Sequence, residues 1–208
     1  MERNHMVMRM KKIGITGGIA SGKSTIKDML VRMNYHVIDS DKIASTLLDV
    51  GTPQYQKIIT YFGEGVLNPN KTINRKILAD IIFHDYGKKE TLNRIIHPEV
   101  RKIIQIELDH FERLGELLIF IDVPLLYEAK FEDMFHKVIM VYVDEKIQLK
   151  RLMERDNITE DYALAKIQSQ MSMKEKKKRA DYVIDNSFSI IETKKQLMQV
   201  LTSIDQEV

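Results

Sequence analysis

The chain has 208 residues, 44% of them hydrophobic and 30% charged, so it is long and apolar enough to bury a substantial core. Its formal net charge of +2 gives no general attraction for nucleic acid or a membrane surface, and the absence of cysteine excludes disulfides, thiolate metal sites and cysteine nucleophiles. We expect a cytoplasmic protein, since the absence of cysteine fits a reducing compartment. No apolar run approaches the roughly 20 residues of a membrane span, and no obligate protein partner is evident. Residues 1–11 read as a polar, Met-rich tail outside the fold.

Five short runs rich in Ile and Val recur along the chain, separated by longer segments with helical spacing. The runs are residues 12–16, 36–39, 117–123, 137–143 and 182–185. Because they hardly alternate with polar residues, they indicate strands that are covered on both faces, as in a parallel sheet flanked by helices. The repeated strand–helix order predicts an α/β fold with a doubly wound sheet of about five parallel strands.

A phosphate-binding loop follows the first predicted strand and leads into a helix predicted over residues 25–33. It has the spacing Gly-x4-Gly-Lys-Ser, in which backbone N–H groups and the helix N-terminus surround an anion. Lys23 would reach the β- and γ-phosphates of a nucleotide, and the Ser24 hydroxyl would bind Mg²⁺. The expected nucleotide-binding residues are Gly17, Gly18, Ile19, Ala20, Ser21, Gly22, Lys23, Ser24 and Thr25.

Carboxylates end several of the strands, at the edge of the sheet where folds of this class bind ligands. Asp41 follows the second strand, about 18 residues beyond Lys23, which suits a kinase because phosphoryl transfer needs a base for the acceptor hydroxyl. Asp41 is our candidate for this base, and the alternative is the N-cap of a helix that starts near Lys42. Asp122 occupies the place of a Walker B carboxylate, where it would either hold Mg²⁺ or cap a helix.

The segment between the second and third strands, residues 51–116, is far longer than a crossover of about 10–15 residues. We interpret it as an inserted helical subdomain, with helices over residues 74–83 and 98–114, that shapes the acceptor site. Arg75 would bind phosphate or serve as a solvated helix charge. His97 precedes a proline, so we expect an extended conformation that aims its ring, and the alternative is a structural histidine.

The basic segment over residues 145–179 predicts two helices with a turn near residues 156–159, as in the lid of a small-molecule kinase. Arg151 and Arg155 are four residues apart and would share a face, from which they could neutralise the transferring phosphate when the lid closes. For most lysines of residues 174–179 we expect a solvated surface.

Five blocks of sequence, in this order along the chain, resemble the dephospho-CoA kinases, which are P-loop kinases of coenzyme A biosynthesis. The blocks are residues 17–24, 39–41, 92–98, 122–128 and 180–186. The resemblance runs from about residue 12 to residue 201 and implies ATP-dependent phosphorylation of the 3′-hydroxyl on the ribose of dephospho-CoA, with Mg²⁺.

The resemblance also implies roles for single residues. Asp41 matches the proposed base, Arg151 the lid arginine near ATP, and Arg75 and His97 residues of the acceptor side. Ser45 departs from the family pattern, because an arginine is common at this position.

The same resemblance divides the chain into functional parts. Residues 12–50, 117–149 and 180–205 would form the nucleotide-binding core, residues 51–116 a CoA-binding subdomain, and residues 150–179 the lid.

Two other hypotheses share the phosphate loop. A nucleoside monophosphate or shikimate-type kinase would have the loop and the lid, but is not expected to carry the blocks at residues 92–98 and 122–128. A nucleotide-dependent switch would need Asn-Lys-x-Asp at a strand end, whereas residues 68–71 read Asn-Pro-Asn-Lys inside the insertion, with no Asp after them.

Overall fold

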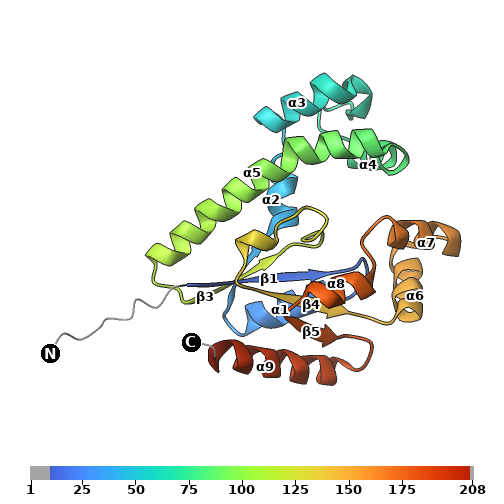
Figure 1. The fold of residues 1–208 in the computed structure, drawn as a ribbon. Helices are drawn as coiled ribbons and strands as arrows, with labels where there is room; N and C mark the ends of the chain where they lie inside the picture. The colour runs from blue at the N-terminus through green and yellow to red at the C-terminus, as the bar shows by residue number, and fades with distance from the viewer. Residues whose placement is uncertain (1–9, 207–208) are drawn as a thin grey trace. The chain divides into compact units, whose positions relative to one another are not determined.

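The computed structural model describes residues 10–206 and contains one five-stranded sheet (Figure 1). Its strands are β1 (Lys11–Gly17), β2 (His36–Asp39), β3 (Leu118–Asp122), β4 (Lys137–Tyr142) and β5 (Tyr182–Asp185). The strand order is β2-β3-β1-β4-β5, and β1 pairs in parallel with both β3 and β4. The predicted parallel α/β sheet is therefore confirmed, with strand ends that differ from the expected ones by at most one residue.

Nine α-helices connect and flank the strands within residues 10–206. They are α1 (Lys23–Arg32), α2 (Ser40–Thr46), α3 (Pro53–Phe62), α4 (Arg75–His84), α5 (Tyr86–Arg113), α6 (Glu145–Asp156), α7 (Glu160–Gln168), α8 (Met173–Arg179) and α9 (Ile190–Gln206). Two short 3₁₀ helices, η1 (Glu64–Val66) and η2 (Glu132–Met134), complete the regular structure. None of the described helices is both long and apolar enough to cross a membrane.

The basic segment forms three helices where the sequence predicted two. Asn157 adopts a left-handed conformation with φ 50° and ends α6, and α7 begins after Thr159. The third helix, α8, is capped by Ser172, whose hydroxyl accepts a hydrogen bond from the Glu175 backbone N–H. This start has the Ser-x-x-Glu spacing of a capping box, which is the local signal for a third helix.

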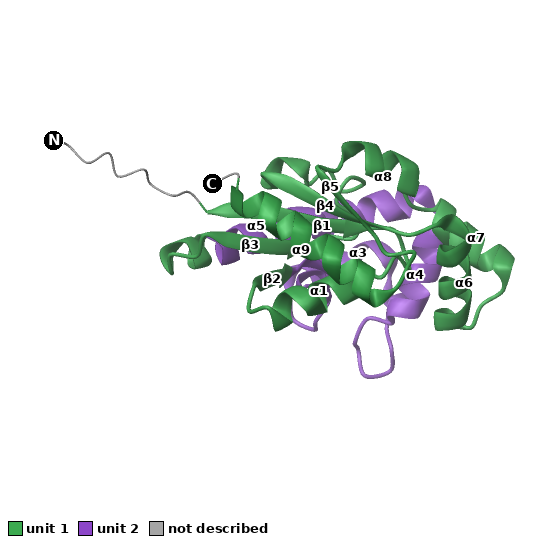
Figure 2. Ribbon diagram, turned by 90° about the horizontal axis from the view of Figure 1, so that it is seen from below, with its two compact units in different colours: residues 1–38, 109–208 green, residues 39–108 purple. Residues whose placement is uncertain are grey.

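The chain forms two compact units (Figure 2). One comprises residues 1–38 with 109–208 and contains nearly the whole sheet; the other comprises residues 39–108 and contains α2, α3, α4 and most of α5. Within the second unit, η1 contacts both α3 and α4. Lys11, which we expected in the tail, begins β1, and Met10 is buried, while residues 1–9 of the expected tail lie outside the described residues. The functional roles and boundaries expected for the core, the CoA-binding subdomain and the lid stay a prediction.

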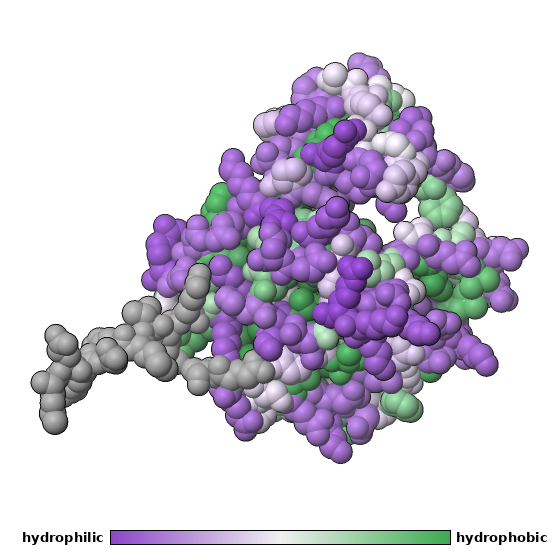
Figure 3. Space-filling model, viewed as in Figure 1, coloured by the Kyte–Doolittle hydropathy of each residue, from purple (hydrophilic) through white to green (hydrophobic). Residues whose placement is uncertain are grey.

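The sheet is covered on both faces, as the unalternated apolar strands predict. On one face, Ile15 and Val141 pack in a cluster with Leu30 of α1 and Leu201 of α9. On the other face, Met140 and Val143 pack against Met173 of α8 and the partly buried Ala180. The molecular face in Figure 3 is mostly hydrophilic, with the hydrophobic residues in small, separate areas.

Helix α5 passes through Pro98, so the expected extended conformation at His97 is wrong. Pro98 cannot donate to the helix, which costs about 3 kcal/mol in a helix interior. However, Ile96, Val100, Ile104 and Leu108 follow each other at intervals of four residues and are all buried. Burial of an aliphatic side chain contributes roughly 1.5–3 kcal/mol, so this face outweighs the effect of the proline.

Replacing Leu30 with alanine tests the packing of α1 on the sheet. Leu30 is fully buried, so Leu30→Ala should lower the free energy of unfolding by about 2–5 kcal/mol, measured by urea denaturation. The neighbouring Val31 is 55% exposed, and Val31→Ala should change it by about 0.5 kcal/mol or less. Equal losses in the two variants would contradict the observed orientation of α1.

Candidate active site

The phosphate loop lies between the carboxyl end of β1 and the first turn of α1. Two of its residues have left-handed conformations, Ala20 with φ 57° and Gly22 with φ 86°. A side chain at Gly22 would collide with the Asn186 amide, so this position requires glycine for both reasons. The Ser21 backbone N–H donates to the Gly18 carbonyl at 3.1 Å, which closes a turn at the tip of the loop.

Lys23 and the buried Asp122 form an ion pair at the base of the loop. Asp122 is only 3% exposed, and its second oxygen lies 3.7 Å from Nζ of Lys27, one helical turn after Lys23. The parallel pairing of Ile15 with Asp122 explains this contact, because it places the end of β3 beside the start of the loop. Asp122 therefore contacts the lysine of the phosphate loop, which favours a role in the site over a capping role.

Arg151 and Arg155 of α6 have different surroundings. A Cβ atom built on Gly22 would lie 3.9 Å from Nη1 of Arg151, so this guanidinium is close to the loop. Arg155 instead hydrogen bonds to Asp156, with Nε at 2.8 Å from Oδ1. Hydrogen bonds from Arg155, which has the larger effect, and from Lys166 lower the pKa of Asp156 to about 2. Of the two arginines, Arg151 is the one that the structure places at the phosphate loop.

Lys176 of α8 is fully buried, although we expected most lysines of this segment to be solvated. Its Nζ lies 2.9 Å from Oε1 of Glu128 and donates to the Pro124 carbonyl at 3.1 Å. Burial lowers the pKa of Lys176, and the Glu128 carboxylate opposes this shift. The spacing of Met173, Lys176 and Ala180 could have predicted this burial, because residues three and four apart lie on one side of a helix, here the side of α8 that meets the sheet.

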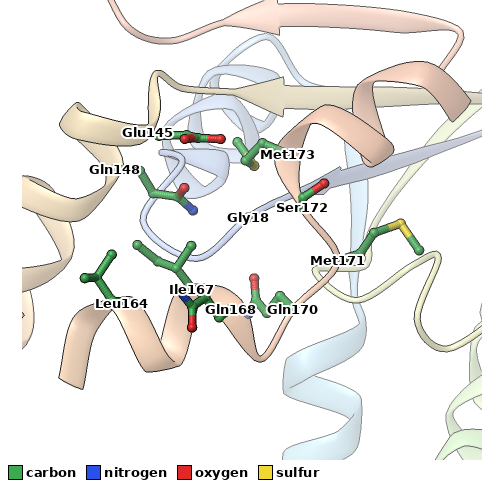
Figure 4. A pocket seen from close by; sticks show the side chains of 10 residues that line it. All are labelled: Gly18, Glu145, Gln148, Leu164, Ile167, Gln168, Gln170, Met171, Ser172 and Met173. Carbon is green, nitrogen blue, oxygen red and sulfur yellow. The ribbon is translucent and has the colours of Figure 1, made fainter. Parts of the chain in front are cut away.

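A cavity of about 380 Å³ lies beside the loop, between helices α6 and α7 and the start of α8 (Figure 4). Gly18 lines it together with Gln148, Gln170 and Met173. Neither Lys23 nor Asp122 belongs to its lining, so the cavity is separate from the position expected for the transferring phosphate. Figure 4 shows the side chains of Gln148 and Gln170 extending toward the loop around Gly18.

Asp41, Arg75 and His97 belong to the second unit. The N-cap of α2 is Asp39, which accepts a hydrogen bond from the Lys42 backbone N–H at 3.0 Å. Asp41 is therefore not this cap, and it is exposed in the first turn of the helix. The capping alternative for Asp41 is removed, and its role as a base stays a prediction.

Arg75 contacts Ser45, the residue that stands where the resemblance leads one to expect arginine. Nη2 of Arg75 donates to the Ser45 hydroxyl at 2.6 Å and to the Ser45 carbonyl at 3.3 Å. The Ser45 hydroxyl thus accepts a hydrogen bond from the Arg75 guanidinium. An arginine side chain at position 45 has no acceptor atom for this hydrogen bond.

His97 is partly buried in α5. Burial lowers the pKa of its imidazole below the ordinary value, and the charge of Glu90 offsets part of this shift. The neutral ring is therefore the dominant form at neutral pH.

The donor set for a metal ion is small. Within residues 10–206, no group of three or more His, Cys, Asp or Glu side chains is arranged to hold a metal ion. Mg²⁺ keeps several water ligands and often uses only one or two protein oxygens, so a hydroxyl and a carboxylate suit its chemistry. Ser24, in the first turn of α1, and Asp122 provide these two oxygen types.

A family model described as dephospho-CoA kinase matches residues 11–192. The chain belongs to the dephospho-CoA kinase family. A dephospho-CoA kinase of Bacillus licheniformis is 48% identical over 189 residues, which cover 91% of this chain and 94% of the relative. This family membership confirms the resemblance found in the sequence.

Solved structures agree with this family. A dephospho-CoA kinase from Campylobacter jejuni superposes with a TM-score of 0.69 at 31% identity, covering 94% of this chain and 98% of that one. A protein from Thermus thermophilus gives a TM-score of 0.80 at 32% identity, with the same coverage. The P-loop kinase fold predicted from the sequence is confirmed.

His97 should make the stability of this family member depend on pH. Its pKa is lower in the folded than in the unfolded protein, so the unfolded chain takes up the proton first as the pH falls below about 6.5. Acidification from about pH 7.5 to about pH 5.5 therefore destabilises the fold through this group. In His97→Gln the unfolding free energy, measured in urea, should fall less over this range than in the wild type. Parallel curves for the two proteins would exclude the effect.

Proposed function

We propose that this protein transfers the γ-phosphoryl group of ATP to the 3′-hydroxyl on the ribose of dephospho-CoA, giving coenzyme A and ADP. This is the final step of coenzyme A biosynthesis. The observation that carries the proposal is the family match over residues 11–192, in a chain whose phosphate loop is complete and whose Lys23 is paired with Asp122. The alternative of a nucleoside monophosphate or shikimate-type kinase is not favoured, because the family model and the Bacillus licheniformis relative are both named dephospho-CoA kinase.

The donor site would consist of the loop and its neighbours. The backbone N–H groups of residues 17–25 and the N-terminus of α1 would bind the phosphates of ATP, and Lys23 would neutralise charge on the β- and γ-phosphates. Arg151, close to Gly22, would add a second cation during transfer. Such fixed charges stabilise the transition state because they are aligned before the reaction begins.

Mg²⁺ would neutralise phosphate charge in the same site. We assign the Ser24 hydroxyl as its direct protein ligand. Asp122, whose carboxylate already contacts Lys23 and Lys27, would act on the ion through water.

The acceptor side would use residues of the second unit. Asp41 would accept the proton of the ribose hydroxyl, while Arg75 and His97 would bind dephospho-CoA. Residues 51–116 would form the CoA-binding subdomain, and residues 150–179 would act as a lid that excludes water during transfer. We place this reaction in the cytoplasm, with a small molecule as its only substrate partner and with no role for nucleic acid or membrane.

An acceptor panel tests the reaction. The protein is incubated with ATP and Mg²⁺ and with dephospho-CoA, AMP, CMP or shikimate in turn, and ADP release is measured. Dephospho-CoA alone should support turnover, with a product phosphorylated on the 3′-oxygen. Turnover with AMP, CMP or shikimate but not with dephospho-CoA would reject the proposal, and release of ADP without dependence on any acceptor would favour a nucleotide switch.

Asp41→Asn tests the assignment of the base. Without the carboxylate, kcat should fall by about 10²-fold or more while the KM for ATP changes little, because the donor contacts remain. Asp49→Asn is the matched control, since Asp49 is an exposed carboxylate a few residues further along the chain. A near-normal kcat in Asp41→Asn would rule out this role.

A further inference from the structure

Alternate carbonyl groups of the phosphate loop are held from outside by side-chain donors. Lys176 Nζ donates to the Gly17 carbonyl at 3.4 Å, and Gln148 Nε2 donates to the Ile19 carbonyl at 2.8 Å. Asn186 Nδ2 donates to the Ser21 carbonyl at 2.8 Å. The three donors come from α8, from α6 and from the residue after β5, so separate elements hold every second peptide group.

These contacts fix the direction of the following N–H groups. In a trans peptide the C=O and N–H bonds lie in one plane and point in opposite directions. The N–H groups of Gly18, Ala20 and Gly22 therefore point away from the side chains that hold the preceding carbonyls. Within residues 10–206, none of these three N–H groups donates to a protein acceptor.

The peptide between Gly18 and Ile19 has the reverse orientation. The Ile19 N–H donates outward to Oε1 of Gln170 at 2.9 Å, and the Gly18 carbonyl accepts from the Ser21 N–H inside the turn. This reversal fits the alternating conformations of the loop, which include left-handed Ala20 and Gly22. Backbone that alternates in this way forms a concave nest of N–H groups that binds anions.

Burial limits the movement of the outer donors, and Asn186 and Lys176 also have further hydrogen-bond partners. Asn186 is 7% exposed, and its Oδ1 accepts the Thr193 hydroxyl at 2.9 Å, so its NH₂ group must face Ser21. Gln148 is 2% exposed, and the Ile19 carbonyl requires a donor rather than a second acceptor. Lys176 is held by Glu128 and by the Pro124 carbonyl.

We propose that Gln148, Asn186 and Lys176 are positioning residues that aim the N–H groups of Gly18, Ala20 and Gly22 at the phosphates of the donor nucleotide. The proposal deepens the donor site of the proposed function and rests on it. These side chains touch the outside of the loop, so they act through its backbone and not on the substrate.

Inorganic triphosphate, in the presence of Mg²⁺, is the probe for this role, because it contains the anion without a base or sugar. Gln148→Glu replaces the donor to Ile19 with an acceptor of the same length. Loss of this hydrogen bond should weaken the binding of both triphosphate and ATP about tenfold or more in isothermal titration. Gln168→Glu is the matched control. It adds the same charge to the wall of the same cavity, but Gln168 is exposed and, within residues 10–206, forms no hydrogen bond with the loop. It should bind both ligands within about twofold of the wild type.

A second variant separates loop positioning from contacts with the base. Asn186→Asp loses the donor to Ser21 but keeps the oxygen that accepts from Thr193. Positioning predicts an equal loss of affinity for triphosphate and for ATP. A loss for ATP alone would show that Asn186 serves the base and would overturn its part in the proposal.

Folding controls accompany these titrations. Thermal unfolding with no ligand establishes that each variant is folded, and Lys176→Met is made together with Glu128→Gln so that no buried charge is left unpaired. Wild-type affinity for triphosphate in a folded Gln148→Glu protein, or an equal loss in Gln168→Glu, would overturn the proposal. Because no acceptor takes part in these titrations, a wrong choice of acceptor would not change their result.

Discussion

The ion pair between Lys23 and the buried Asp122 is the interaction on which the donor half of this molecule depends. A carboxylate that is 3% exposed is stable only when cations compensate for its lost hydration, and here two lysines of α1 do so. The contact exists because β1 and β3 are neighbours in parallel register, which brings their carboxyl ends to one edge of the sheet. The pairing of β1 with β3 and the start of α1 at Lys23 thus together bring this lysine and Asp122 into contact.

Much of this arrangement could be predicted from sequence because it is local. Runs of apolar residues predicted the strands nearly to the residue, and the glycine spacing predicted the phosphate loop. The missed start of α8 had a local signal in Ser172 and Glu175, whereas the other two failures came from tertiary packing. The residue before Pro98 is helical because an apolar face of α5 is buried on both sides of it, and no rule about neighbouring residues contains that information. Lys176 looks like one member of a charged run, and only the packing of α8 on the sheet shows that it is enclosed.

The candidate residues of the second unit show another limit of sequence analysis. Asp39 and Asp41 are two aspartates that lie two residues apart, so either could cap α2 on sequence grounds. In the structure, Asp39 is the N-cap. At position 45 the family pattern suggested that a charge is lost, whereas the structure shows a hydroxyl that accepts the guanidinium of Arg75. In both cases the role of the residue depends on a partner in space, the Lys42 N–H for Asp39 and the Arg75 guanidinium for Ser45.

The alternation of peptide directions in the phosphate loop has a consequence for how the protein can evolve. Each outer donor meets a carbonyl only because the number of residues between Gly17 and Ser21 keeps every second peptide in phase. Inserting or deleting one residue would move the carbonyls of Ile19 and Ser21 out of register with Gln148 and Asn186, which belong to other parts of the fold, and these hydrogen bonds would be lost. The loop can therefore exchange side chains at several positions, but its length is locked to the elements around it.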